Sequence, residues 1–299
     1  MSKSIYTLVD DIYALMQNRE IPEGVDVDAE IERFGEAVKS LMKKEFTPQE
    51  RDTRKLRLSA IGKDDRQLWY SANKYTQEKL KPHTYIKFMY GHMIEELILF
   101  LTRMSGHAVE DEQKQCEVEG IKGHMDARID GRLVDIKSTS SYAFKKFKDA
   151  TLAYDDPFGY VAQLKAYAHS EGDTKYGWIA IDKQNGHLCY LEYDEEDTQA
   201  PVYSEINYDI AERVRHVKKL VELPEPPGFC NEPVADGKSG NKKLATGCSY
   251  CDFKHHCYPT LRGFAYSTGV RFLTEVQNEP NVPEIDLGNG QKQKEGQAA

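Results

Sequence analysis

Residues 123–137 read GHMDARIDGRLVDIK, and they contain the strongest local signal for secondary structure in the chain. Asp130-Gly131 separates two short runs in which apolar and polar residues alternate. An Asp-Gly pair between such runs is typical of a β-hairpin turn. We therefore expect one strand at residues 123–130 and a second strand at residues 132–138, paired through this turn.

The expected hairpin gathers two carboxylates and an amine. Side chains two apart on a strand share a face, so Asp135 and Lys137 point to one place and Ile136 points into the core. The turn brings Asp126, on the first strand, beside that pair. At least one carboxylate pKa should rise unless a cation lies between the acids. An exposed ion pair with Lys137 or Arg128 is the alternative for this stretch alone.

A divalent ion would give such a group a chemistry. Mg²⁺ prefers oxygen ligands and keeps several waters, and a bound metal ion polarises a phosphoryl oxygen and generates hydroxide. Lys137 could orient the attacking water or neutralise charge on the scissile phosphate. The group therefore favours a phosphodiester as substrate.

The wider pattern predicts an α/β core with helices on its faces. Its expected elements are a helix within residues 72–104, a strand at 113–119, the hairpin, a helix at 157–170, strands at 175–182 and 187–193, and a helix at 203–222. Amphipathic stripes predict a helical N-terminal region at 1–53. We expect the core at 54–223, a cysteine-rich segment at 224–275 and a disordered tail at 276–299.

The composition excludes several classes of protein. The chain has 299 residues, a formal net charge of -9 and 39% hydrophobic residues, enough for a packed core. No apolar run approaches the roughly 18 residues of a membrane helix, and acids interrupt the apolar stretch at the start, unlike a secretory signal. Net acidity argues against a protein that holds nucleic acid by charge alone, but allows an enzyme with a local basic groove. We expect no membrane partner.

Residues outside the hairpin extend the acidic group. Glu95 lies one helical turn after Gly91, where close backbone packing could place it near the metal. Glu96 adjoins Glu95 but points about 100° away on an ideal helix. Gln163 and Tyr167 share a helix face at i, i+4, and they offer hydrogen bonds and a stacking ring with a polar tip.

The order Gly91-x-x-x-Glu95, Gly123-x-x-Asp126, Asp135-x-Lys137, Gln163-x-x-x-Tyr167 resembles the PD-(D/E)XK nuclease superfamily. Within it the chain is similar to the RecB-like branch, which includes CRISPR-associated RecB-like nucleases and viral exonucleases with an iron–sulfur cluster. The resemblance spans about residues 54–260 and implies a restriction-endonuclease-like mixed sheet flanked by helices. It implies Mg²⁺ or Mn²⁺ held by Glu95, Asp126, Asp135 and the Ile136 carbonyl, catalysis by Lys137, and substrate contacts by Gln163 and Tyr167.

Four of the six cysteines are crowded together. Cys230, Cys248, Cys251 and Cys257 lie within 28 residues, and the last three are spaced C-x2-C-x5-C. In a reducing compartment such crowding favours metal binding over disulfides. Four thiolates suit either Zn²⁺ or a [4Fe–4S] cluster, and His255 or His256 could replace one thiolate at zinc.

The resemblance implies the [4Fe–4S] cluster, with Zn²⁺ as the alternative, because RecB-like nucleases with a cluster carry C-x2-C-x5-C just after the core. Their first cysteine lies upstream of the core, in a segment that resembles residues 58–70 of this chain. That segment has Asp64 and Asp65 and no cysteine. Either Cys230 supplies the fourth ligand or the site differs. In both cases we expect the bound metal or cluster to stabilise a loop-rich segment.

Basic side chains cluster in two places. Lys145, Lys146 and Lys148 follow the catalytic lysine and alternate with phenylalanines, and an earlier group is Arg51, Arg54, Lys55, Arg57, Lys63 and Arg66. Such groups neutralise phosphates, and nearby rings stack on unpaired bases. The resemblance favours Arg66 as an end or phosphate contact. A solvated, charged helix face is the alternative.

These observations predict a Mg²⁺- or Mn²⁺-dependent DNA nuclease, an exonuclease in replication, repair or recombination, in the cytoplasm of a bacterium or an infected host cell. No helicase signature is present, so unwinding would need a separate helicase or recombination protein. The alternatives are a structure-selective endonuclease and a non-catalytic, metal-stabilised DNA-binding or adaptor protein on a nuclease fold.

Overall fold

The computed structural model describes residues 3–47, 55–75, 77 and 82–287. Its contacts divide the chain into two compact units, unit 1 with residues 1–63 and 80–219, and unit 2 with residues 64–79 and 220–299. The division differs from the boundaries expected from the sequence, because it groups residues 64–75 with the cysteine-rich segment instead of with the core. Among the described helices, none has the length and apolar character needed to span a bilayer.

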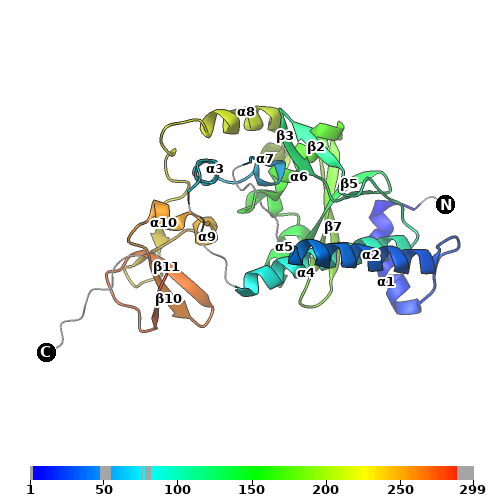
Figure 1. The fold of residues 1–299 in the computed structure, drawn as a ribbon, viewed down its shortest axis with the longest axis horizontal. Helices are drawn as coiled ribbons and strands as arrows, with labels where there is room; N and C mark the ends of the chain where they lie inside the picture. Colours follow the sequence, from blue (N-terminus) through cyan, green and yellow to red (C-terminus); the bar gives the residue numbers. More distant parts are fainter. Residues whose placement is uncertain (1–2, 48–54, 76, 78–81, 288–299) are drawn as a thin grey trace. The chain divides into compact units, whose positions relative to one another are not determined.

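Unit 1 is built on a five-stranded mixed sheet, which confirms the predicted α/β class (Figure 1). Its strands lie in the order β1 (Val109–Glu110), β4 (Ala127–Ile129), β5 (Arg132–Thr139), β6 (Lys175–Asp182) and β7 (Leu188–Asp194). β5 and β6 run parallel, and the other neighbours run antiparallel. Asp130 and Gly131 both have positive φ in the β4–β5 turn, as a type I′ hairpin turn requires.

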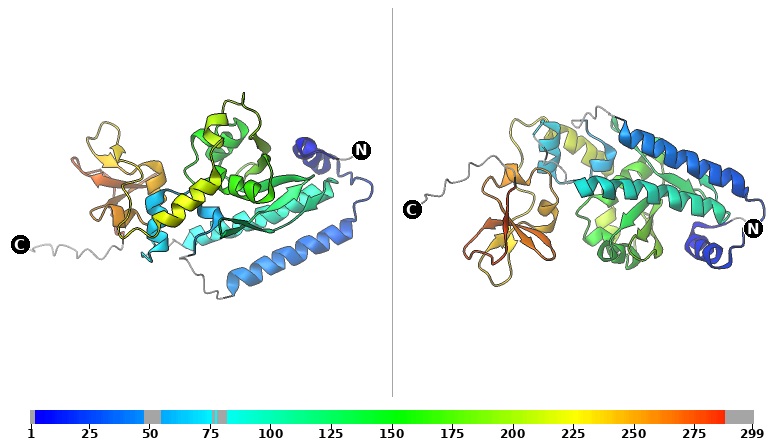
Figure 2. Two further views of the ribbon diagram at one scale, coloured as in Figure 1. Left: turned by 90° about the horizontal axis from the view of Figure 1, so that it is seen from above. Right: turned by 60° about the horizontal axis from the view of Figure 1, so that its bottom comes forward.

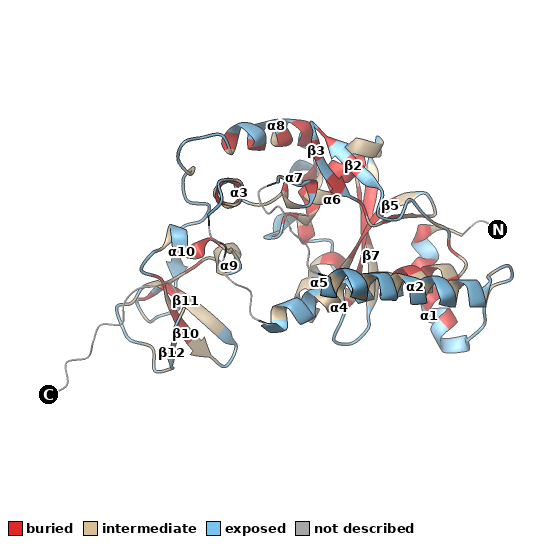
Figure 3. Ribbon diagram, in the orientation of Figure 1, coloured by how far each residue is buried: buried red, intermediate tan, exposed pale blue. Residues whose placement is uncertain are grey.

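One face of this sheet carries the apolar core. Short α1 (Leu8–Asn18) and long α4 (Pro82–Met104) cover it, and the buried side chains packed there include Leu8, Ile12, Ile98, Leu99, Val134, Ile136 and Ile179. α2 (Val27–Phe46) runs alongside α4 as an outer helix (Figure 2). It contains no buried residue, so Figure 3 draws it as intermediate and exposed.

The other face carries the connection between the parallel strands. α5 (Ser141–Lys148) and α6 (Tyr160–Glu171) form this crossover, which parallel pairing requires. Because side chains alternate along a strand, Asp135 and Trp178 face this side while Ile136 and Ile179 face the apolar core. α6 begins after Pro157, later than the sequence predicted, because Gly159 is its N-cap in the left-handed conformation.

The helix expected at 203–222 is divided into α7 (Tyr203–Ile206) and α8 (Ile210–Leu220). The interruption has a local cause. Asp209 Oδ1 accepts a hydrogen bond from the Glu212 amide at 2.9 Å, and a side chain that caps a helix start competes with a continuous helix.

The predicted first strand of the hairpin is also interrupted. β3 (Ile121–His124) pairs with β2 (Gln115–Val118) in a separate two-stranded sheet, whereas β4 pairs with β5. Met125 and Asp126 lie between β3 and β4. The prediction of one strand at 123–130 is therefore wrong at these two residues, and Asp126 lies in a break rather than on a strand.

Unit 2 combines α3 (Asp65–Ala72), the short helices α9 (Thr246–Ser249) and α10 (Lys254–Cys257), and an antiparallel sheet. The sheet order is β12 (Glu284–Ile285), β10 (Arg262–Tyr266), β11 (Gly269–Glu275), β9 (Lys242–Lys243) and β8 (Val234–Ala235). β12 lies in the stretch that we expected to be disordered and pairs with β10. Residues 288–299 of that tail lie outside the described residues.

Candidate active site and cysteine pocket

Asp135 and Lys137 lie side by side on β5, as their spacing predicts. Lys137 Nζ is 2.5 Å from Asp135 Oδ2, and the Asp135 side chain is 1% exposed. Asp135 Oδ1 accepts a hydrogen bond of 3.3 Å from Gln163 Nε2 of α6. Apart from its ion pair, Asp135 Oδ2 is buried without a hydrogen bond.

Asp126 reaches the same strand from the break between β3 and β4. Its Oδ2 accepts a hydrogen bond of 2.7 Å from the backbone amide of Ile136. This bond replaces a backbone partner at the middle of β5 and fixes the carboxylate next to Asp135. The metal-ligating role of the Ile136 carbonyl stays a prediction.

Glu95 joins the group from α4, whereas Glu96 faces other residues. Glu95 Oε1 accepts a hydrogen bond of 2.8 Å from Gln113 Nε2, and the Gln113 amide donates to the Asp126 carbonyl at 3.0 Å. Gln113 has φ +53° and was missed in the sequence, since an isolated glutamine carries no signal. We define the acidic cluster as Glu95, Asp126, Asp135 and Lys137.

Gly91 does not have the role that the sequence suggested. A Cβ atom added at Gly91 would meet nothing within 4 Å. The prediction that close backbone packing at Gly91 positions Glu95 is therefore wrong, and the contact with Gln113 holds Glu95 instead.

The carboxylates of the acidic cluster are short of positive charge. Burial, with the charges of Asp135 and Glu96, raises the pKa of Glu95 to about 7. Burial and the charges of Asp135 and Glu95 raise the pKa of Asp126 well above its usual range, and burial raises the pKa of Asp135 despite Lys137. Burial alone would lower the pKa of Lys137, but the charges of Asp135 and Asp126 outweigh it and raise that pKa.

This donor set fits a hard divalent cation in its chemistry. Three carboxylates face one ammonium, and carboxylate oxygens are preferred ligands of Mg²⁺. Within the described ranges, no group of three or more His, Cys, Asp or Glu side chains is arranged so that it could hold a metal ion. In this conformation Asp135 is paired with Lys137, and Asp126 with a backbone amide.

α6 presents three residues toward the acidic cluster, and the sequence found two of them. Gln163 contacts Asp135 and also donates to Tyr167 Oη at 3.4 Å. The Tyr167 ring is 1% exposed and packs against Gly123, so the expected stacking role is wrong for this ring. The third residue is Tyr160, one turn before Gln163, whose ring centroid lies 4.7 Å from Lys137 Nζ.

The predicted basic contacts have different surroundings. Lys145 is exposed on α5, whereas Lys146 Nζ binds the Asp155 carbonyl at 2.9 Å and its carboxylate at 2.6 Å. Lys146 therefore ties α5 to the loop before α6 instead of standing free for phosphate. Arg51 and Arg54 lie outside the described residues.

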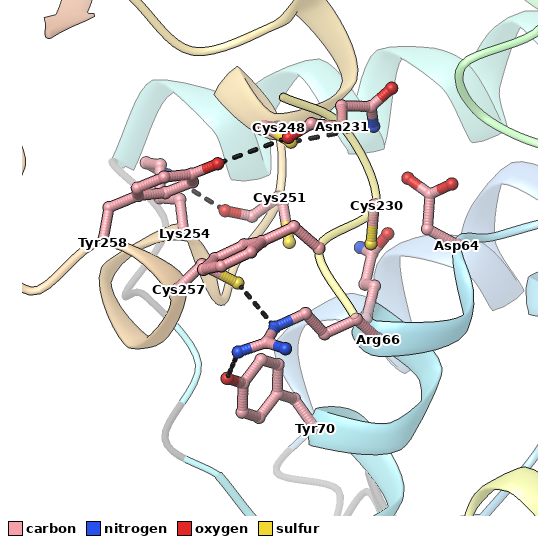
Figure 4. Close-up of a pocket in the computed structure, with 12 residues that line it drawn as sticks. Asp64, Arg66, Tyr70, Cys230, Asn231, Cys248, Cys251, Lys254, Cys257 and Tyr258 are labelled. Atoms are coloured by element: carbon pink, nitrogen blue, oxygen red, sulfur yellow. Dashed lines mark hydrogen bonds between the residues drawn. The ribbon is translucent and has the colours of Figure 1, made fainter. Parts of the chain in front are cut away.

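The four clustered cysteines line one pocket of unit 2 (Figure 4). We name it the cysteine pocket; its other lining residues are Asp64, Arg66, Gln67, Tyr70, Phe229, Asn231, Lys254 and Tyr258. The backbone amides of Arg66 and Gln67, at the start of α3, favour the Cys230 thiolate, but burial outweighs them and raises the Cys230 pKa. Cys230 thus lies beside Asp64, in the segment where the resemblance expects the first cysteine.

Burial suppresses ionisation of Cys230, Cys248 and Cys251. It raises the pKa of Cys230 to about 11 and that of Cys251 to about 12, and it also raises the pKa of Cys248. A metal ion or cluster binds thiolates and releases their protons. Four thiols that line one pocket fit such a group by their chemistry.

Arg66 belongs to the cysteine pocket. Its Nε donates to Cys257 Sγ at 3.3 Å and one terminal nitrogen donates to Tyr70 Oη at 3.0 Å. The guanidinium also lies 4.6 Å from the Phe229 ring centroid and contacts the Pro227 carbonyl. The structure therefore gives this side chain protein partners, and its contact with a DNA end or phosphate stays a prediction.

No family model matches the chain, and no curated protein matches it in sequence. A solved structure named SSO0001 is 16% identical with a TM-score of 0.40, covering 73% of this chain and 92% of that chain. An alkaline exonuclease from Laribacter hongkongensis is 14% identical with a TM-score of 0.36, covering 57% and 91%. Its complex with dAMP has the same score and coverage at 13% identity. TM-scores this low do not carry residue roles from one chain to another.

Proposed function

We propose that unit 1 is a Mg²⁺- or Mn²⁺-dependent DNA nuclease of the RecB-like PD-(D/E)XK type, acting as an exonuclease. One observation carries the proposal. A buried Asp135–Lys137 pair on β5 lies with Asp126 and Glu95 in one acidic cluster, in the order of motifs that the sequence shows. Such a group of acids with an amine is suited to hydrolysis of a phosphodiester.

The residues of the acidic cluster divide the work. Glu95, Asp126 and Asp135 would hold the ion, which polarises the phosphoryl oxygen and lowers the pKa of the attacking water when bound. Lys137 is protonated and buried, so its ammonium neutralises charge that develops on the scissile phosphate. Gln163 fixes Asp135 through a hydrogen bond, and the Tyr160 ring holds the ammonium in place.

The test is a cleavage assay with Mg²⁺ or Mn²⁺ on end-labelled linear DNA and on covalently closed circular DNA, each single- and double-stranded. We expect linear DNA to be degraded to small products and closed circles to survive. Cutting of closed circles would identify an endonuclease instead. Binding to DNA without cleavage under either metal would favour the non-catalytic alternative.

Two variants assign the activity to this site. Lys137→Ala and Asp135→Asn should each reduce the initial rate by about 10³-fold. Glu117→Gln is the matched control, because Glu117 is an exposed carboxylate on β2 that pairs with Lys122 at 3.8 Å, outside the acidic cluster. Wild-type rates in folded Asp135→Asn protein, checked by circular dichroism, would refute the assignment.

For the cysteine pocket we propose a structural [4Fe–4S] cluster held by Cys230, Cys248, Cys251 and Cys257. The proposal rests on the lining of one pocket by all four thiols and on the C-x2-C-x5-C spacing. Anaerobically purified protein should be brown, absorb at roughly 400 nm and contain iron. A colourless protein with one zinc per chain would establish the zinc alternative.

A further inference from the structure

An aromatic stack leads from the acidic cluster to solvent. The Tyr160 ring lies under the Lys137 ammonium and stacks on Phe158, at a centroid distance of 5.6 Å and an interplanar angle of 28°. The buried Phe147 ring lies further from Tyr160, at a centroid distance of 6.4 Å. Phe158 is 44% exposed. The order from inside to outside is therefore ammonium, half-buried phenol ring and exposed phenyl ring.

The loop that carries Phe158 is held rigidly. Asp156 Oδ2 accepts the Val161 amide at 2.8 Å, and the Asp156 backbone carbonyl accepts the Gly159 amide at 3.3 Å. Lys146 holds the neighbouring Asp155. A loop fixed in this way loses little conformational freedom when a ligand binds.

A backbone contact fixes the same loop from the opposite side. A Cβ added at Gly62 would lie 2.5 Å from the Gly159 Cα, and a Cβ at Gly159 would be equally close to the Gly62 backbone. Gly159 also has φ +75°, which favours glycine. The two glycines let the backbones touch, so Phe158 is presented in one position.

We propose that Phe158 and Tyr160 form a stacking platform for one unpaired nucleobase of the strand being cut, next to the scissile phosphate. The proposal rests on the nuclease function and specifies its substrate as a single strand or a frayed end. A phosphate contacting Lys137 has its attached nucleosides within reach of a ring that already stacks beneath that ammonium. Phe158 has no polar atom on its side chain, so it accepts any base by its π face.

A base paired in a duplex is stacked on its neighbours and cannot lie on this ring. The platform therefore discriminates by strand state and not by sequence. It predicts cleavage of single-stranded oligonucleotides in preference to blunt duplexes, with little dependence on base identity.

Binding is measured first, because it does not require turnover. Fluorescence anisotropy with a labelled single-stranded 12-mer and Ca²⁺ compares wild type, Phe158→Ala, Phe158→Trp and Phe46→Ala. Phe46 is the control, an exposed phenylalanine at the end of α2. We expect Phe158→Ala to weaken binding by about fivefold or more, Phe158→Trp to restore it, and Phe46→Ala to leave it unchanged. Equal binding by folded Phe158→Ala and wild type would overturn the platform.

A substrate-side test locates the base. A series of oligonucleotides carries one abasic site, moved one position at a time past the cut. Wild type should show a raised KM at one position, and Phe158→Ala should lose that dependence while its kcat stays within about threefold. A KM insensitive to every abasic position overturns the platform even where DNA is cut, whereas absence of cutting with normal Phe158-dependent binding counts against the nuclease function alone.

Discussion

The acidic cluster of unit 1 and the cysteine pocket of unit 2 both gather groups that metals bind, but they are held by different means. The acidic cluster draws on a long helix and a sheet strand packed against an extended apolar core. The cysteine pocket draws on loops, on four-residue helices and on the start of α3. Around it, the apolar cluster of buried residues is Trp69, Tyr70 and Phe253.

In unit 1 the folded core holds the site together. In unit 2 a bound metal or cluster would hold the fold together. In unit 1 the carboxylates repel one another, and burial raises their pKa. The free energy of packing the apolar core must therefore offset this repulsion. Beside the cysteine pocket the buried apolar cluster is small, and a bound cluster would supply folding free energy directly. Loss of ligands should therefore abolish chemistry in unit 1 and order in unit 2.

The largest expected effect is on catalysis by unit 1. Asp126→Ala should reduce the rate of DNA cleavage by about 10³-fold, or about 4 kcal/mol of transition-state stabilisation. It should also cost roughly 1–3 kcal/mol of unfolding free energy, because the Ile136 amide loses its acceptor. Steady-state kinetics and urea denaturation measure the two losses. Unchanged cleavage would show that the acidic cluster is not catalytic.

The second effect concerns the order of unit 2. Removing the metal or cluster with an anaerobic chelator should speed amide hydrogen exchange by about 100-fold or more in α3 and in residues 246–257. Exchange in β5 and β6 should not change, and these strands are the internal control. Equal acceleration in both units would show that the bound metal or cluster does not order unit 2 specifically.

A smaller effect should follow from Gln113→Ala. Glu95 loses its hydrogen bond of 2.8 Å, worth about 1 kcal/mol, and a misplaced ligand should lower kcat by about five- to tenfold. Gln115→Ala is the control, since Gln115 is an exposed glutamine two residues further along. Raising the Mg²⁺ concentration should restore part of the Gln113→Ala rate. If Gln115→Ala lowered kcat by the same factor, Gln113 would not be shown to position Glu95.

The smallest effect is a gain in stability from Gly91→Ala. A methyl group there meets open space, and alanine in a helix interior is favoured over glycine by up to about 1 kcal/mol. Thermal unfolding should therefore shift upward slightly. Gly123→Ala should do the opposite, because its Cβ would lie 2.7 Å from the Tyr167 ring. If the Gly91→Ala protein were destabilised, Gly91 would be shown to lie in close packing with a neighbouring element.

The spacing of apolar residues along the sequence predicted the regular helices and strands. Apolar alternation and the Asn185-Gly186 turn placed a strand at 175–182, and β6 has these bounds. The same reasoning missed the break at Asp126, because a carboxylate that bonds a backbone amide ten residues away leaves no trace in alternation. The local pattern of apolar residues predicts which face of a strand or helix is buried. It does not predict which backbone groups will form hydrogen bonds with side chains.

The candidate site shows the same division. Asp135 and Lys137 follow from strand spacing, and Gln163 follows from its position on one face of a helix. Gln113 and Tyr160 act through contacts between elements, so no local pattern singled them out. The exposed ring expected at Tyr167 is buried, whereas Phe158, outside any motif, is exposed.

The chain order of unit 2 has a consequence during synthesis. α3 is translated before most of unit 1, whereas Cys230 and the C-x2-C-x5-C segment that pack with it come after unit 1 is finished. At 5–20 residues per second a ribosome needs roughly 10–40 s between the end of α3 and Cys257. During that interval Trp69 and Tyr70 cannot pack against Phe253, which has not yet been synthesised. A nascent chain would therefore be a target for chaperones at α3, and delivery of any cluster would follow translation.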